Sequence, residues 1–225
     1  MARSGDGGEV TVFRFEAHPF WDFSLRIYGS DGVPAACIAL QERHGIDVNL
    51  LLFSAWFGES GRGVLAESDL DAALATTTTW NLDIVCALRG VRNRLKAGIS
   101  PIPTERSDML RKMILEIEVK SEHVEQIALA AAVPRQANPA LAARRRGDDA
   151  VANIAAYFRR HGFTPDAEDA RQVAIVLDPA VPQIGRAALA EKFRAEATAD
   201  TKADAVRGTA AQPIPRHHPN PRGRS

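Results

Sequence analysis

The sequence predicts an all-α fold, a single helical bundle-like domain of about seven or eight helices with disordered termini. Apolar residues recur at spacings of three and four along most of the chain, which is the period of an amphipathic helix. Prolines and glycines fall where the first turns and the ends of such helices are expected. Two short runs, residues 10–15 and 173–177, remain open to a strand interpretation; for the first, an extended arm is the preferred one.

The composition is that of an ordinary globular protein. Of the 225 residues, 45% are hydrophobic and 25% are charged, and the formal net charge is zero. A neutral chain argues against nucleic acid or an anionic membrane as its main partner. The sequence begins without an apolar signal-peptide core and contains only two cysteines. We therefore expect a cytoplasmic protein.

The most apolar stretch of the chain is interpreted as three consecutive helices. The first begins at Pro19 and ends at Gly29, which we expect in the left-handed conformation. The second ends at Gly45, and the third follows Asp47 as its N-cap. The third helix is apolar on nearly every side, but it ends at Gly58, far short of the roughly 20 residues that a membrane span needs. It is therefore the predicted centre of the core.

The middle of the chain predicts two further helices before a long one. Ser68 and Asp71 resemble a capping pair that opens the first of them. The four threonines at 76–79 are poor helix formers and predict a break or kink. The next helix, residues 80–95, has an apolar stripe and is followed by Gly98.

A long helix is predicted over residues 104–133, capped by Thr104 or Ser107 and ended by Pro134. This helix is long enough to pair with another one, either inside the chain or in a dimer. Ser121 interrupts its apolar stripe. The stripe consists of Leu110, Met113, Ile114, Ile117, Val124, Ile127, Ala128 and Ala131.

Beyond this helix the composition changes. Pro139 is expected to begin a short helix, and residues 151–158 a separate amphipathic one that ends at Gly162. Periodicity does not decide whether 173–177 is a helix or a strand, and 187–199 is weakly helical.

Two segments, FWDFSLRIYG and PAACIALQERHGIDVNLLLFSAWFG, resemble the opening of an uncharacterised family of small, mainly proteobacterial proteins. Its members are hypothetical proteins that carry a domain of unknown function. The resemblance covers about residues 20–133. It implies an all-helical bacterial protein and carries over no functional residues.

These observations divide the chain into four parts. They are a flexible N-terminal arm at 1–17, a family-like helical core at 18–133, additional helices packed on or extending that core at 134–199, and a disordered basic tail at 200–225.

The candidate site residues are polar side chains next to the apolar helices. Asp47 and Asn49 either bind a polar ligand or serve only to cap their helix. Arg89, Arg92 and Lys96 share one helix face, which either holds an anion or is a solvated outer face.

No catalytic constellation, metal-ligand spacing or cofactor motif is present in the sequence. The preferred function is therefore a non-catalytic interaction or regulatory module, which pairs with itself or another protein through the 104–133 helix. The alternative is an enzyme or small-ligand-binding protein with a pocket lined by aromatics such as Trp21, Tyr28 and Trp56. A third interpretation, nucleic-acid binding by the tail and residues 144–146, is not favoured.

Overall fold

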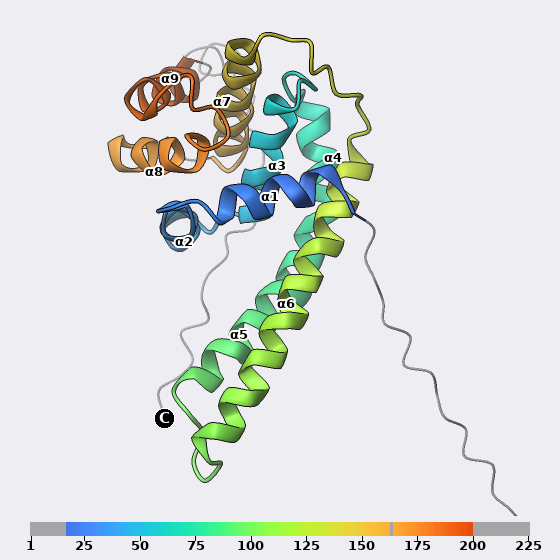
Figure 1. Ribbon diagram of the computed structural model, residues 1–225, viewed down its shortest axis with the longest axis vertical. Helices are drawn as coiled ribbons and strands as arrows, with labels where there is room; N and C mark the ends of the chain where they lie inside the picture. Colours follow the sequence, from blue (N-terminus) through green and yellow to red (C-terminus); the bar gives the residue numbers. More distant parts are fainter. Residues whose placement is uncertain (1–16, 163, 200–225) are drawn as a thin grey trace, which may run out of the picture.

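The computed structural model describes residues 17–162 and 164–199, and all regular structure within them is helical. The all-α prediction is confirmed. The predicted N-terminal arm (except for Ala17) and the basic tail at 200–225 lie outside the described residues. A body of short helices carries one pair of long helices that projects away from it (Figure 1).

The first two helices begin and end near the predicted positions. α1 (Pro19–Tyr28) starts with proline in its first turn, and α2 (Val33–His44) ends at Gly45. Gly45 has φ of 66°, in the left-handed region that favours glycine. The same prediction for Gly29 is wrong, because its φ is −74° and the chain leaves α1 through an ordinary right-handed turn.

α3 (Val48–Glu59) is the centre of the core, as predicted. Of its 12 residues, the ten from Asn49 to Gly58 are buried. A helix that is apolar all round needs neighbours on every side, and α3 contacts α1, α6 and α7. The predicted N-cap is confirmed, because the Asp47 carboxylate accepts the backbone N–H of Asn49 at 2.8 Å.

α4 (Glu67–Trp80) starts one residue before the predicted cap. The carboxylate of Asp69, rather than that of Asp71, reaches back and accepts the backbone N–H of Ala66 at 2.9 Å. The predicted capping pair of Ser68 and Asp71 is therefore wrong. Asp69 and Asp71 are two residues apart and of the same type, so the sequence alone does not show which of them caps the helix.

The four threonines of α4 do not break the helix. Three of their hydroxyls donate to carbonyl oxygens four residues earlier, which helical geometry permits. The irregularity lies one turn later, as a π-helical turn at Asn81–Val85 that leads directly into α5 (Cys86–Lys96). Helical backbone angles continue through both junctions, so α4, this turn and α5 form one rod.

α6 (Thr104–Ala132) is the long helix that the sequence predicts. Pro103 occupies its N-cap position, so neither predicted cap is correct; the Ser107 hydroxyl instead donates to the carbonyl of Thr104 at 2.9 Å. α6 runs back alongside the rod of α4 and α5 (Figure 1). We call the projecting part, residues 86–120, the arm.

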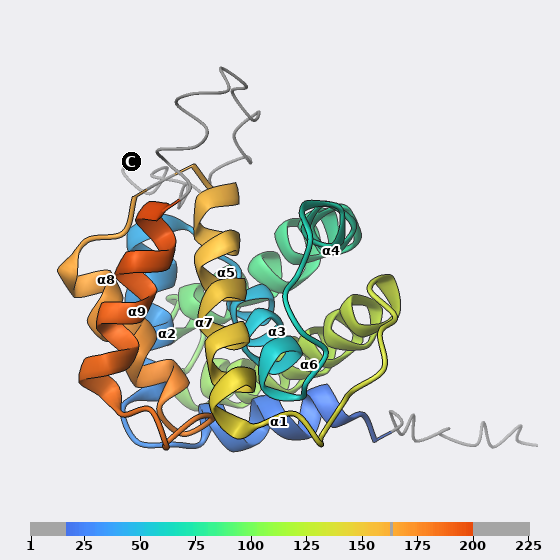
Figure 2. The ribbon, with the colours of Figure 1, turned by 90° about the horizontal axis from the view of Figure 1, so that it is seen from above.

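The last three helices are α7 (Ala143–Arg160), α8 (Ala167–Leu177) and α9 (Arg186–Ala199). The region predicted as two helices is one, because α7 continues through Gly147, and the helix predicted at Pro139 does not form. α8 settles the ambiguous run at 173–177 as helical. In Figure 2 these helices lie beside one another on one side of α3.

One hydrophobic core includes residues from Phe20 to Ala197, so helices from both halves of the chain share it. α7 crosses α3 at very short range. A Cβ atom built on Gly58 would lie 2.2 Å from the backbone nitrogen of Ala150, so glycine is required there. Within the described residues, none of the helices combines the length and apolarity needed to cross a membrane.

Candidate functional site

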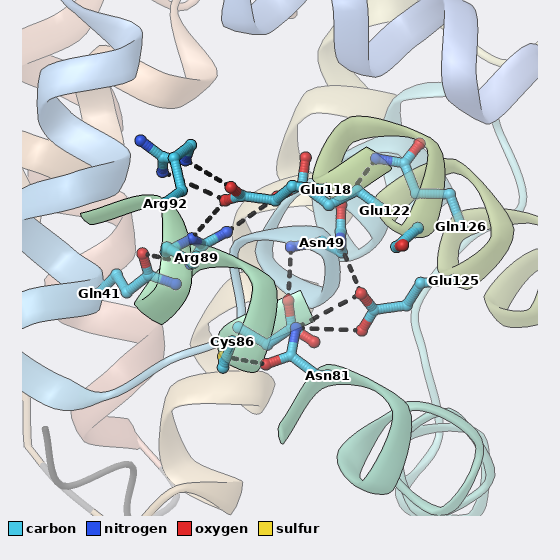
Figure 3. A network of polar contacts seen from close by, with 12 residues as sticks. Gln41, Asn49, Asn81, Cys86, Arg89, Arg92, Glu118, Glu122, Glu125 and Gln126 are labelled. Carbon is cyan, nitrogen blue, oxygen red and sulfur yellow. Dashed lines mark hydrogen bonds and ion pairs between the residues drawn. The ribbon is translucent and has the colours of Figure 1, made fainter. Parts of the chain in front are cut away.

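A cavity of about 630 Å³ lies where α1, α2, α3, α5 and α6 meet. This volume is in the range of small-molecule sites in proteins. All five polar residues that the sequence singles out line it, although they come from two regions forty residues apart. They are Asp47, Asn49, Arg89, Arg92 and Lys96. Figure 3 shows the polar network along its wall.

Arg89 and Arg92 of α5 point at α6 instead of at solvent. Arg89 Nε lies 2.8 Å from Glu118 Oε1, and Arg92 Nε lies 2.5 Å from Glu118 Oε2 (Figure 3). Arg89 also donates to Glu122 at 2.8 Å and to Gln41 at 2.9 Å. The interpretation of this face as a solvated outer surface is therefore wrong for both arginines.

These contacts limit what Arg89 can bind. All three of its nitrogens already donate to side chains in the site, so an added anion would have to displace one of them. The adjacent carboxylates raise its pKa, although burial acts in the opposite direction. Lys96 is exposed at the rim of the cavity.

Asp47 and Asn49 form the second part of the site. Besides capping α3, Asp47 has its backbone N–H bonded to the hydroxyl of Tyr157 at 2.9 Å. The side-chain amide of Asn49 donates to Glu125 Oε2 at 2.8 Å and accepts from Gln126 Nε2 at 2.8 Å (Figure 3). Both residues therefore have structural partners.

Glu125 is a buried carboxyl group with an unusual protonation state. Burial and the adjacent Asp47 carboxylate raise the pKa of Glu125 to about 10. Burial raises the pKa of Asp47 as well. A close carboxyl pair of this kind shares one proton at neutral pH, because two adjacent negative charges would repel. Asn81 supports Glu125 from the π-helical turn, with its amide 3.3 Å from Oε1.

The two cysteines are neutral thiols, with Cys37 buried and Cys86 partly buried. Burial raises the pKa of the Cys37 thiol to about 12 and that of Cys86 to about 11. The Cys86 thiol donates to Asn81 Oδ1 at 3.3 Å. Neither environment generates a reactive thiolate.

Aromatic side chains contribute to the cavity from α1. Trp21 and Tyr28 both line it, and the Trp21 ring stacks on His123 with a centroid distance of 4.2 Å. Trp56 does not line it, contrary to our expectation. It stacks instead on Phe20 at 5.1 Å and carries the guanidinium of Arg62 over its ring.

The residues that α6 contributes to the site were not predicted from the sequence. They are Glu118, Glu122, Glu125 and Gln126. Their spacing of three and four places them on one side of the long helix. That periodic polar side is the signal in the sequence that indicates them, and the apolar stripe of the same helix does not. Among the described residues, no three histidine, cysteine or acidic side chains come together as a metal site.

Residues 19–129 match the model of a protein family described as "Protein of unknown function (DUF2390)". This match confirms the resemblance of the first helices to a family with a domain of unknown function. Neither the curated proteins nor the solved structures gave a significant match. The family description names no activity.

Proposed function

We propose that the protein is a non-catalytic interaction module that associates with a second copy of itself through one side of the arm. This side, which we call the apolar flank, consists of Leu110, Met113 and Ile117 on α6. The proposal rests on one observation: the apolar flank faces solvent, while the adjacent polar side of α6 is buried.

The exposure of this flank supports the proposal directly. The exposed fractions are 47% for Leu110, 54% for Met113 and 50% for Ile117. The three residues follow one another at spacings of three and four, which is the seam pattern of helices that pair lengthwise. Contiguous apolar surface of this kind marks interaction sites in soluble proteins.

The rod beside α6 adds further apolar surface. Trp80, Ile84 and Val91 are exposed on the rod although they are large and apolar. The Trp80 indole N–H donates to the carbonyl of Ser121 at 3.0 Å, which holds its ring against α6. Aromatic residues are enriched in the centres of protein interfaces.

A second copy of the chain suits this flank because the flank is self-complementary. Two antiparallel copies of α6 would bury the same three apolar residues on both sides, as an isologous dimer requires.

Size-exclusion chromatography with light scattering tests the proposal. We expect wild-type protein at twice the chain mass of 24.4 kDa, and Ile117→Lys at the mass of one chain. The matched control is Val64→Lys, which places the same charge on an exposed apolar residue outside the arm and leaves the dimer intact. A wild-type protein that stays monomeric at all concentrations contradicts the proposal.

A further inference from the structure

The cavity is separate from the apolar flank, although α6 contributes to both. Leu115, Val119, Glu122 and Gln126 line the cavity and are spaced by three and four residues. The apolar flank of Leu110, Met113 and Ile117 lies on a different side of the same helix. A ligand in the cavity and a partner on the flank would therefore contact different residues of α6.

Three residues that line the cavity have a buried polar atom that lacks a hydrogen-bond partner. One is Asp47 Oδ2, in the carboxyl pair with Glu125. The other two are Ser24 Oγ on α1 and Gln126 Oε1 on α6, in residues whose exposed fractions are 4% and 2%. An unsatisfied buried polar group costs about 1–3 kcal/mol. Both residues line the cavity, so a molecule bound there could satisfy both atoms.

The orientation of the Gln126 amide follows from its neighbours. Asn49 directs its NH₂ group to the Glu125 carboxyl, so its oxygen must accept a hydrogen bond. That bond comes from Gln126 Nε2, which leaves Gln126 Oε1 as an acceptor. The bound molecule must therefore present an N–H or O–H donor to this oxygen.

The remaining wall is apolar and aromatic. Eight apolar and aromatic side chains from four helices line it, and five of them are markedly exposed, whereas Trp21, Val48 and Leu52 are partly or fully buried. The exposed ones are Leu25, Tyr28, Ile38, Leu115 and Val119. Such walls accommodate a flat apolar body, and aromatic faces attract cations in addition.

The charges inside the cavity favour a cation. Arg89 and Arg92 supply two positive charges, while Glu118, Glu122 and the Asp47 carboxylate supply three negative ones. At the rim, exposed Glu42 and Lys96 offset each other. One negative charge is left over in a partly enclosed space, where charges are less screened than at the surface.

We propose that this cavity binds an organic cation, an aromatic molecule with a protonated amine. Its ring lies along Trp21 and Tyr28, and its N–H groups donate to Gln126 Oε1 and Ser24 Oγ. The volume of about 630 Å³ admits a molecule of two or three rings.

Calorimetric titration of the full-length protein with two matched probes tests this assignment. Naphthylmethylamine is positively charged at pH 7, and naphthoate has the same rings with a negative charge. We expect the amine to bind once per chain and at least about tenfold more tightly than the carboxylate, a difference of about 1.4 kcal/mol. Equal binding, a preference for naphthoate, or no saturable binding of the amine overturns the proposal.

Two substitutions locate the bound probe. Val119→Trp fills the cavity and should abolish amine binding, whereas Met109→Trp adds the same ring to an exposed residue that does not line the cavity and should leave it unchanged. Amine binding that survives Val119→Trp places the probe elsewhere and overturns the proposal.

The hydrogen bonds are tested separately. Gln126→Met removes the acceptor, and we expect about tenfold weaker binding of the amine. Ser24→Ala changes only a hydroxyl and serves as the second readout if Gln126→Met disturbs the Asn49 network. If the folded Ser24→Ala and Gln126→Met proteins both bind the amine as wild type does, the assigned contacts are wrong.

Discussion

Arg89 and Glu118 are paired across the arm, with Nε 2.8 Å from Oε1, and their ion pair joins α5 to α6 (Figure 3). Only 4% of the Glu118 side chain is exposed. Arg92 binds the other oxygen of the same carboxylate at 2.5 Å. The arm therefore has buried charges in a place where helical pairs usually have apolar side chains, while Leu110, Met113 and Ile117 are exposed.

Removing the shared carboxylate should destabilise the protein strongly. Glu118→Ala leaves the partly buried Arg92 without its counter-ion and Arg89 with Glu122 alone. We expect a loss of about 3–5 kcal/mol in the free energy of unfolding. Chemical denaturation at a fixed protein concentration measures it. Glu116→Ala, an exposed glutamate two residues away, should change stability by less than about 0.5 kcal/mol. Equal effects of the two substitutions would show that the buried pair contributes nothing.

Stability should fall with rising pH because of Glu125. In the unfolded chain this carboxyl loses its proton near its ordinary pKa of 4.5, whereas in the folded protein its pKa is about 10. Between these values folding takes up a proton, so each pH unit lowers the free energy of unfolding by up to about 1.4 kcal/mol.

Glu125→Gln removes that proton uptake and keeps the hydrogen-bonding shape. We expect its stability relative to wild type to increase steadily from pH 5 to pH 9, with Glu116→Gln as the control that follows wild type. Denaturation curves across this range measure the difference. Parallel pH profiles for wild type and Glu125→Gln would contradict the assigned protonation state.

Two glycines inside helices should respond in opposite directions to alanine. Gly58→Ala places a Cβ within 2.2 Å of the Ala150 backbone nitrogen, so α3 and α7 must separate, at a cost of about 3 kcal/mol or more. At Gly90, a Cβ would meet no neighbouring side chain or packed helix within 4 Å, and Gly90→Ala should stabilise α5 by up to about 1 kcal/mol. Thermal unfolding of both variants checks the contrast. A mild effect at Gly58 would mean that α3 and α7 are not in close contact there.

The two thiols should be unreactive while the protein is folded. With the pKa of Cys37 at about 12 and that of Cys86 at about 11, little thiolate exists at pH 8. Labelling by a chromogenic disulfide reagent should be at least about a hundredfold slower in the native protein than in denaturant. Rapid native labelling of either cysteine would contradict its raised pKa.

The sequence was sufficient where local signals decide the structure. Pro19, Gly45 and Asp47 mark helix ends by their own chemistry. Because α3 is apolar on nearly every side, it has to lie at the centre of the core. These features depend on neighbours within a few residues. The four threonines were misleading because helix propensity is weak enough for tertiary packing to override it.

The site was predictable in part. The five candidate residues were chosen from two helices, and the fold brings them to one cavity. Their partners could not be deduced, because the burial of Arg89 depends on Glu118, which lies 29 residues further along the chain. An amphipathic helix normally buries its apolar side and exposes its charged side. In the arm, Arg89 and Arg92 are instead partly buried against α6.

Pulsed electron paramagnetic resonance gives the most direct test of the apolar flank as the self-association surface. A spin label at Lys120→Cys lies beside the flank, and the raised pKa values of Cys37 and Cys86 protect the native thiols from labelling. We predict a dipolar signal between labels on two copies, which disappears when Ile117→Lys is added and persists with Val64→Lys. A labelled protein without any dipolar signal, or with one that Ile117→Lys leaves unchanged, contradicts the assignment of this surface.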